Sequence, residues 1–256
     1  MIIKKFLNKI NISIYTIILV FLAFLAGLFK EIIVISIIII IHEFGHYLMI
    51  LKYKWNIKKI TIYPFGGVCL LDEEIDKPLF EEFIITAAGP LFQEILFIII
   101  VFLYKFNIID TYIFNLFKNY NITILVFNLL PIIPLDGSKL LNILINKIFN
   151  FRLSYFLNII ISIIFLSIFF IIFKKDSSYY LILIFLMSQI LYYYKNRYII
   201  FNRFILERSL RKKDFTKYKK INSIKKMYRN KKHLFKRNGT YITENNYMRI
   251  FRKEKK

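Results

Sequence analysis

The sequence predicts an all-α polytopic membrane protein with about six transmembrane helices, a short β-hairpin-like loop after the second helix and a basic cytoplasmic tail. Three observations lead to this fold class. Of the 256 residues, 57% are hydrophobic and only 7 are glycine. Several apolar stretches approach 20 residues, the length that a helix needs to cross a bilayer. Lysine and arginine gather between these stretches and after the last one, as in the loops of a membrane protein.

The six expected spans are the stretches in which apolar residues are nearly continuous. They lie near residues 12–29, 32–51, 83–104, 122–135, 154–173 and 179–194. The fourth and sixth are short or have weak polar flanks, so their ends are uncertain by several residues. The first follows a basic start, as a signal peptide would, but its length and the lack of a clear small-residue cleavage site favour a retained helix.

The distribution of positive charge predicts the orientation. Short segments on the side of the termini hold eleven Lys or Arg residues before the tail is counted, and the opposite segments hold five. The positive-inside rule then places both termini in the cytoplasm, in a multi-pass protein of the cell membrane. We expect residues 1–195 to form the membrane domain and residues 196–256 to form the tail. The single cysteine, Cys69, excludes an intramolecular disulfide.

The tail is strongly basic. From Lys195 onward there are 22 Lys or Arg residues against 4 Asp or Glu. We expect the tail to lie near anionic lipid headgroups, which attract such segments to the inner leaflet. No nucleic acid is expected as a partner, because the tail contains no recognisable nucleic-acid-binding module.

The second span contains the motif H-E-F-G-H. His42 and His46 are four residues apart, so on a helix they lie on one face and can share a metal ion. Glu43 lies beside them, and H-E-x-x-H on a helix is typical of zinc hydrolases in which the glutamate is the general base. The alternatives are a chance match or histidines that bond neighbouring helices. His46 precedes Lys52 by six residues, about 9 Å of helix rise, which puts the motif near the inner leaflet.

A catalytic zinc site typically has three protein ligands and a water. His233 lies in the tail and is a poor candidate for the third ligand. Asp136 stands at the cytoplasmic end of the fourth span, at the depth of the two histidines. Pro131 and Pro134 should break the helix there, and Gly137 should let the chain turn tightly. Asp136 is therefore the expected third ligand, with an ordinary interfacial carboxylate as the alternative.

Residues 57–74 follow the metal-binding span. Their Ile/Val alternation around a Pro-Phe-Gly-Gly turn predicts a β-hairpin, with an ordinary amphipathic loop as an equal alternative. A helical substrate hides its carbonyl groups in hydrogen bonds and must become extended before it can be cut. The edge of the hairpin could pair with such an extended strand.

These motifs together resemble the site-2 protease family of intramembrane zinc metalloproteases. "HEFGH" and "NLLPIIPLDG" carry the resemblance, and "AAGPL" at residues 87–91 matches a further motif of the family. "PFGGV" at residues 64–68, the six spans and the lack of a periplasmic PDZ domain make the chain most similar to the sporulation branch. The resemblance covers about residues 1–194.

The resemblance implies Zn²⁺ as the cofactor, with His42, His46 and Asp136 as its ligands and Glu43 as the catalytic base. Asn128 matches the family asparagine that precedes the LDG motif and would hold the substrate or the oxyanion. On spacing alone, Asn128 could instead bond a neighbouring helix. Many relatives have asparagine three residues after the Gly-Pro pair, where this chain has Gln93.

The resemblance also implies partners. The substrate would be a membrane-associated protein, such as a sigma-factor precursor processed during sporulation, and membrane inhibitor proteins would regulate the cut. The branch ends in a nucleotide-sensing cystathionine-β-synthase-type domain, of which this tail, with a hairpin signal at Asn238-Gly239, would be a reduced version.

Three alternative functions remain open from the sequence. One is a housekeeping site-2 protease that acts on another membrane protein, and a second is an inactive membrane scaffold of the same fold. The third is a metal transporter, which should place polar groups along a path across the bilayer. The polar groups here cluster at one depth, which favours a protease.

Overall fold

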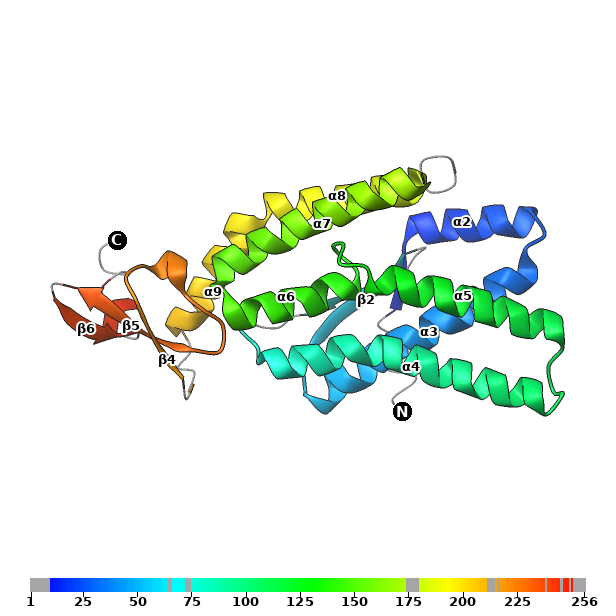
Figure 1. The fold of residues 1–256 in the computed structure, drawn as a ribbon, viewed down its shortest axis with the longest axis horizontal. Coiled ribbons are helices and arrows are strands. Elements are labelled where there is room, and N and C mark those ends of the chain that lie inside the picture. The colour runs from blue at the N-terminus through cyan, green and yellow to red at the C-terminus, as the bar shows by residue number, and fades with distance from the viewer. Residues whose placement is uncertain are drawn as a thin grey trace. The chain divides into compact units, whose positions relative to one another are not determined.

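A computed structural model of the chain describes residues 10–63, 66–71, 75–173, 180–210, 215, 217–237, 239–244, 246–248 and 250. The chain forms two compact units. The first comprises residues 1–73, 83–130 and 134–137, and the second comprises residues 74–82, 131–133 and 138–256. Figure 1 follows the elements along the chain.

The first unit combines apolar helices with a small sheet. Its elements are β1 (Ile10–Ile12), α2 (Ile14–Leu25), α3 (Phe29–Lys52), β2 (Ile57–Tyr63), β3 (Gly66–Leu71), α4 (Leu79–Lys105, of which the first turn belongs to the second unit) and α5 (Thr111–Leu129).

The second unit combines further helices with the basic tail. Its elements are α6 (Asp136–Ile148, of which the first two residues belong to the first unit), α7 (Phe151–Phe173), α8 (Tyr180–Lys195), α9 (Arg197–Leu210), β4 (Tyr218–Ile221), the short 3₁₀ helix η2 (Ile224–Lys226), β5 (Lys232–Arg237) and β6 (Thr240–Thr243).

Among the described residues, three helices are long and apolar enough to cross a membrane, namely α3, α4 and α7. Apolar helices α2 and α8 are shorter. These helices expose large aliphatic and aromatic side chains; Phe21 in α2 is 59% exposed and Ile98 in α4 is 53% exposed. Apolar surface of this extent requires an apolar environment such as lipid. Six spans would require α2, α5 and α8 to cross as well, and that part stays a prediction.

The fourth expected span differs from the helix that forms. Helix α5 begins at Thr111 rather than near residue 122, because the Asp110 carboxylate accepts a hydrogen bond from the Ile113 N–H (2.7 Å) and caps it. It ends at Leu129, so residues 130–135 are irregular, as the two prolines predict. Helix α6 then begins at Asp136. This helix was not expected, since it is amphipathic rather than continuously apolar.

The sheet of the first unit confirms the predicted hairpin and adds a strand. Strands β2 and β3 pair antiparallel, with Tyr63 opposite Gly66, whereas Pro64 and Phe65 of the predicted turn lie outside the described residues. Strand β1 pairs parallel with β2 in the order β1-β2-β3, at a place where the first span was expected to begin. Both edges of β2 are therefore paired, and the outer edges of this sheet, as far as the structure describes it, belong to β1 and β3. Strand β3 contacts α3.

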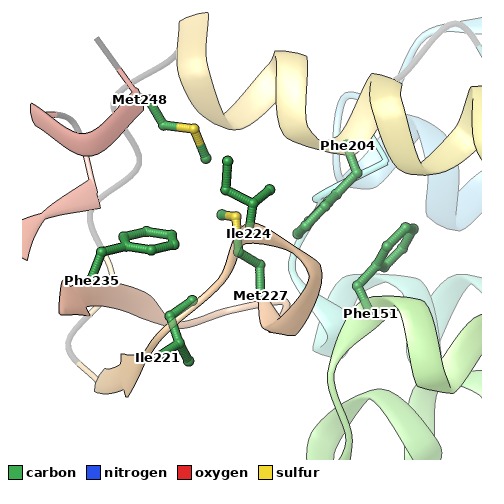
Figure 2. Close-up of a cluster of buried hydrophobic side chains, with 7 residues drawn as sticks. All are labelled: Phe151, Phe204, Ile221, Ile224, Met227, Phe235 and Met248. Carbon is green, nitrogen blue, oxygen red and sulfur yellow. The ribbon is translucent and has the colours of Figure 1, made fainter. Parts of the chain in front are cut away.

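The tail folds into a second three-stranded sheet, which is more than the hairpin expected from the sequence. Arg237 pairs with Thr240 between antiparallel β5 and β6, and Gly239 has a φ of 81°, which confirms the predicted hairpin; Asn238 lies outside the described residues. Strand β4 pairs parallel with β5. Figure 2 shows the buried core beneath this sheet, which comprises Phe151, Phe204, Ile221, Ile224, Met227, Phe235 and Met248.

Ion pairs of buried arginines join the tail to the residues just before α4 and in its first turn. The Arg208 guanidinium, 3% exposed, lies 2.6 Å from the Asp76 carboxylate. Arg229 pairs with Glu82 at 2.7 Å. His233 is 1% exposed, and its Nδ1 lies 2.9 Å from a carboxylate oxygen of Glu244 while its Nε2 accepts the N–H of Tyr228. Both nitrogens of His233 are thus used in the tail core.

Candidate metal centre

Helix α3 places the H-E-x-x-H motif in the protein interior. His42, Glu43 and His46 are 2%, 4% and 7% exposed. The two imidazole rings lie one turn apart, with centroids separated by 4.9 Å. This arrangement confirms the expected shared face, which follows from the four-residue spacing on a regular helix.

Asp136 completes a tight cluster of donor atoms. Its Oδ2 lies 3.1 Å from the Nε2 of His42 and 3.0 Å from the Nε2 of His46. The two Nε2 atoms are 3.2 Å apart. The aspartate is 4% exposed. The three donor atoms therefore lie close together, although 90 or more residues separate Asp136 from the histidines in the sequence.

The hydrogen bonds of the two rings determine which nitrogen faces this point. His46 Nδ1 lies 2.8 Å from the carbonyl oxygen of Ile85, which can only accept, so Nδ1 carries the proton. His42 Nδ1 lies 3.0 Å from Oε1 of Gln93. The Gln93 amide is oriented by its Nε2, which donates to the carbonyl of Asn121 at 2.8 Å. In the neutral rings both Nε2 atoms therefore present lone pairs to Asp136.

This donor set fits a zinc ion. Two imidazole lone pairs and a carboxylate oxygen at this separation repel one another unless a cation or additional protons lie among them. A tetrahedral zinc ion with bonds of about 2.0–2.1 Å needs ligand atoms about 3.3–3.4 Å apart, and the separations here are 3.0–3.2 Å. Three protein ligands leave the fourth position for water or substrate.

Two glycines let α3 and α4 approach closely at the centre. A Cβ atom on Gly89 of α4 would overlap the ring nitrogens of both His46 and His42. A Cβ atom on Gly45 of α3 would come within 2.5 Å of the Ala88 carbonyl oxygen. Small residues at helix contacts allow such approach in membranes. This contact explains the glycine of the "AAGPL" motif, because any side chain at position 89 would overlap the two histidine rings.

Glycine is required at position 137 by close packing between helices and not by the tight turn that the sequence predicted. It lies in the first turn of α6, where a Cβ atom would overlap the backbone carbonyl groups of Leu129 and Leu130. The missing side chain therefore lets the start of α6 pack against the end of α5. This contact holds the neighbouring Asp136 in place.

Asn128, near the end of α5, is 5% exposed. Its side chain makes no hydrogen bond to any residue that the structure describes, so the alternative of a bond to a neighbouring helix is not observed there. The amide therefore has donors and an acceptor available for a bound molecule.

Gln93 is a residue whose role the sequence did not predict. The sequence identified it only as a departure from the asparagine of many relatives, whereas the structure places it, fully buried, against the ring of His42. A polar side chain inside an apolar span is the signal that could have indicated this role. Asn121 belongs to the same network, and its Nδ2 donates to Glu94 at 2.9 Å.

Two histidines and an aspartate around a metal-sized space, next to a buried glutamate on apolar helices, define a membrane-embedded zinc hydrolase. The model of peptidase family M50 matches residues 30–110. The chain is 34% identical over 204 residues to stage IV sporulation protein FB of Bacillus subtilis (strain 168). The aligned residues cover 78% of this chain and 71% of that protein.

Two further comparisons agree. A zinc metalloprotease of Methanocaldococcus jannaschii is 31% identical over 116 residues, or 44% of this chain and 33% of that protein. The structure of the site-2 protease from the same organism matches with a TM-score of 0.56 and 26% identity, over 72% of this chain and 87% of that chain. The chain belongs to the M50 family of site-2 proteases, and so it is a membrane zinc metalloendopeptidase.

Proposed function

We propose that this chain hydrolyses a peptide bond of a membrane-associated protein close to the cytoplasmic face of the membrane. The convergence of His42, His46 and Asp136 to within 3.2 Å carries the proposal. We assign these residues as zinc ligands and Glu43 as the general base. When bound, zinc lowers the pKa of a coordinated water and polarises a carbonyl group.

Glu43 moves the proton in this reaction. Its carboxylate accepts a proton from the attacking water and then donates it to the nitrogen of the leaving amine. Asn128 donates an amide N–H to the carbonyl oxygen of the scissile bond as negative charge develops there. The buried position of Asn128 and its lack of a partner among the described residues support this role.

The substrate binds as an added strand. Because β2 is paired on both sides, the outer edge of β3 is the available edge of this hairpin. Backbone groups on that edge would hold the substrate extended, which exposes the carbonyl groups that a helix would hide. The contact of β3 with α3 supports this site, since α3 carries Glu43.

The topology that suits this function has six spans and cytoplasmic termini. Helices α2, α3, α4, α5, α7 and α8 would cross the membrane. Residues 1–195 then form the protease domain, and residues 196–256 form a cytoplasmic regulatory tail. The excess of Lys and Arg on the terminal side supports this orientation.

The proposed substrate is a membrane-associated sigma-factor precursor cut during sporulation, with membrane proteins as inhibitors. The name of the Bacillus subtilis relative supports the link to sporulation. A housekeeping role on another membrane protein is the alternative function within the same class.

Co-expression tests this proposal. The chain and its Glu43→Gln variant are each expressed with a candidate sigma-factor precursor, and cleavage is followed on a gel. Zinc is measured in both purified proteins. We expect equal zinc in both and cleavage by the wild type alone, with the variant slower by about 10²–10⁴-fold because the base is lost. Cleavage at the wild-type rate by the variant would remove Glu43 from the mechanism, and zinc without cleavage of any membrane substrate would favour the scaffold.

A further inference from the structure

A cavity of about 950 Å³ lies within the second unit, at the start of α7. Its wall consists of the first turns of α7, the junction between α8 and α9, and Lys225 of η2. The proposed protease mechanism uses none of these residues. The size of the cavity is in the range of small-molecule and cofactor sites, which is about 300–1,000 Å³.

The cavity wall is positively charged. Arg152, Arg197 and Lys225 line it, and no aspartate or glutamate does. Among the described residues, none of these three side chains forms an ion pair. The first turn of α7, a helix of 23 residues, adds the partial positive charge of a helix N-terminus. A ligand that fits this wall must therefore carry negative charge.

Arg197 is held in a fixed orientation. Its guanidinium stacks on two rings, 3.9 Å from the centroid of Tyr194 and 4.4 Å from that of Tyr198. One of its nitrogens donates to the carbonyl of Tyr194 at 2.9 Å. These contacts leave further N–H donors for an anion, and an arginine already ordered loses less entropy when it binds a phosphate.

Apart from Asn150 and Asn202, the remainder of the wall is aromatic and apolar. Phe156 is 50% exposed and Tyr198 is 59% exposed, while Ile159 lies deeper and is 4% exposed. Helix α7 is also one of the three helices that are apolar enough to cross a membrane. The cavity thus lies where an apolar helix gives way to arginine, lysine and tyrosine, a composition typical of the membrane–water interface.

We propose that this cavity binds one anionic phospholipid from the inner leaflet. The phosphate is bound by Arg152, Arg197 and Lys225, and an acyl chain lies along Phe156 and Ile159. Basic pockets beside membrane helices bind anionic headgroups in this manner. A free phosphate would satisfy the charges but would leave the apolar part of the wall uncovered.

Native mass spectrometry of the full chain in detergent tests the proposal with phosphatidylglycerol as the probe and phosphatidylcholine as the comparison. The test variant is Arg152→Gln/Lys225→Gln, in which both changed side chains are exposed. The control is Lys226→Gln/Lys236→Gln, which removes the same charge at exposed positions outside the cavity. We expect one phosphatidylglycerol bound per chain, at least tenfold weaker binding in the test variant and unchanged binding in the control.

Three results would overturn the proposal. Equal weakening in both variants would mean general attraction to the tail, and equal affinity for phosphatidylcholine would remove the role of charge. Displacement of the lipid by millimolar inorganic phosphate or ATP would assign the cavity to a soluble anion. Arg197→Lys serves as a second variant because it keeps the charge but loses the planar stacking, and we expect intermediate affinity. Circular dichroism and zinc content should be unchanged in every variant, which would show that the fold is intact.

Discussion

Gln93 acts on the metal centre through a hydrogen bond rather than as a ligand. Its Oε1 accepts the Nδ1 proton of His42, which fixes the ring so that Nε2 faces Asp136 and His46. The backbone carbonyl of Asn121 fixes the amide in turn. Residues in this position usually change metal affinity without being ligands themselves.

We predict that Gln93→Leu weakens zinc binding by about 10–100-fold, because His42 loses the acceptor that orients it. The control is Glu94→Gln, one residue further along α4, which contacts Asn121 and not the histidine. Competition with a fluorescent zinc chelator measures both affinities. Equal affinities in the two variants would show that Gln93 only fills space.

At the scale of elements, the contact between α3 and α4 positions the two histidines of the metal centre. Helix α3 provides both histidines, and α4 provides the Ile85 carbonyl and Gln93 as their acceptors. The close approach at Gly45 and Gly89 keeps these groups within hydrogen-bonding distance.

We predict that Gly89→Ala disrupts the centre, although alanine is the better helix former. The added methyl group overlaps both imidazole rings, and overpacking of this kind costs about 1–3 kcal/mol. Zinc content after dialysis should fall, and thermal unfolding should occur at a lower temperature. Leu91→Ala is the control, since its side chain is 61% exposed. Full zinc occupancy in Gly89→Ala would mean that α3 and α4 can move apart without a loss of zinc affinity.

The tail is a second element whose contacts can be tested. We predict that Arg208→Met destabilises the tail by about 3–5 kcal/mol, because the buried Asp76 carboxylate loses the guanidinium that lies 2.6 Å from it. Arg203→Met on the same helix is the control. The Arg203 side chain is 51% exposed and pairs with Glu207 four residues away, which should contribute less than about 1 kcal/mol. Hydrogen exchange of β4 to β6 measures the difference, and equal protection in both variants would contradict it.

At the scale of the whole molecule, the proposed orientation can be tested with single cysteines. Cys69 is first replaced by serine, and cysteine is then introduced at Phe106, just after α4, or at Lys226 in the tail. A membrane-impermeant thiol reagent is applied to each face of sealed vesicles. We predict that Lys226→Cys reacts only from the cytoplasmic face and Phe106→Cys only from the opposite face, because the proposed topology places three spans, α5, α7 and α8, between the two positions. The reverse pattern would invert the topology and exclude a cytoplasmic substrate.

The sequence by itself determined the class of protein and the chemical groups at its centre. The spacing of His42, Glu43 and His46 requires only a helix to bring the histidines onto one face, and hydropathy indicated where that helix lies. The matched depth of Asp136 indicated the third donor. The hairpins were also predictable, because turn residues and strand alternation are local signals.

Only the tertiary structure decided how these groups are held. The acceptors for the two Nδ1 protons come from α4, and no local pattern in α3 specifies them. The need for glycine at position 137 likewise comes from a close approach between helices, whereas the sequence predicted a tight turn there. The folded core of the tail was missed because the tail sequence is so highly charged. Its buried arginines are neutralised only when distant segments meet, since Arg208 pairs with Asp76 and Glu244, and Arg229 pairs with Glu82. Contacts between residues far apart in sequence leave no periodic signal, and therefore only packing determines them.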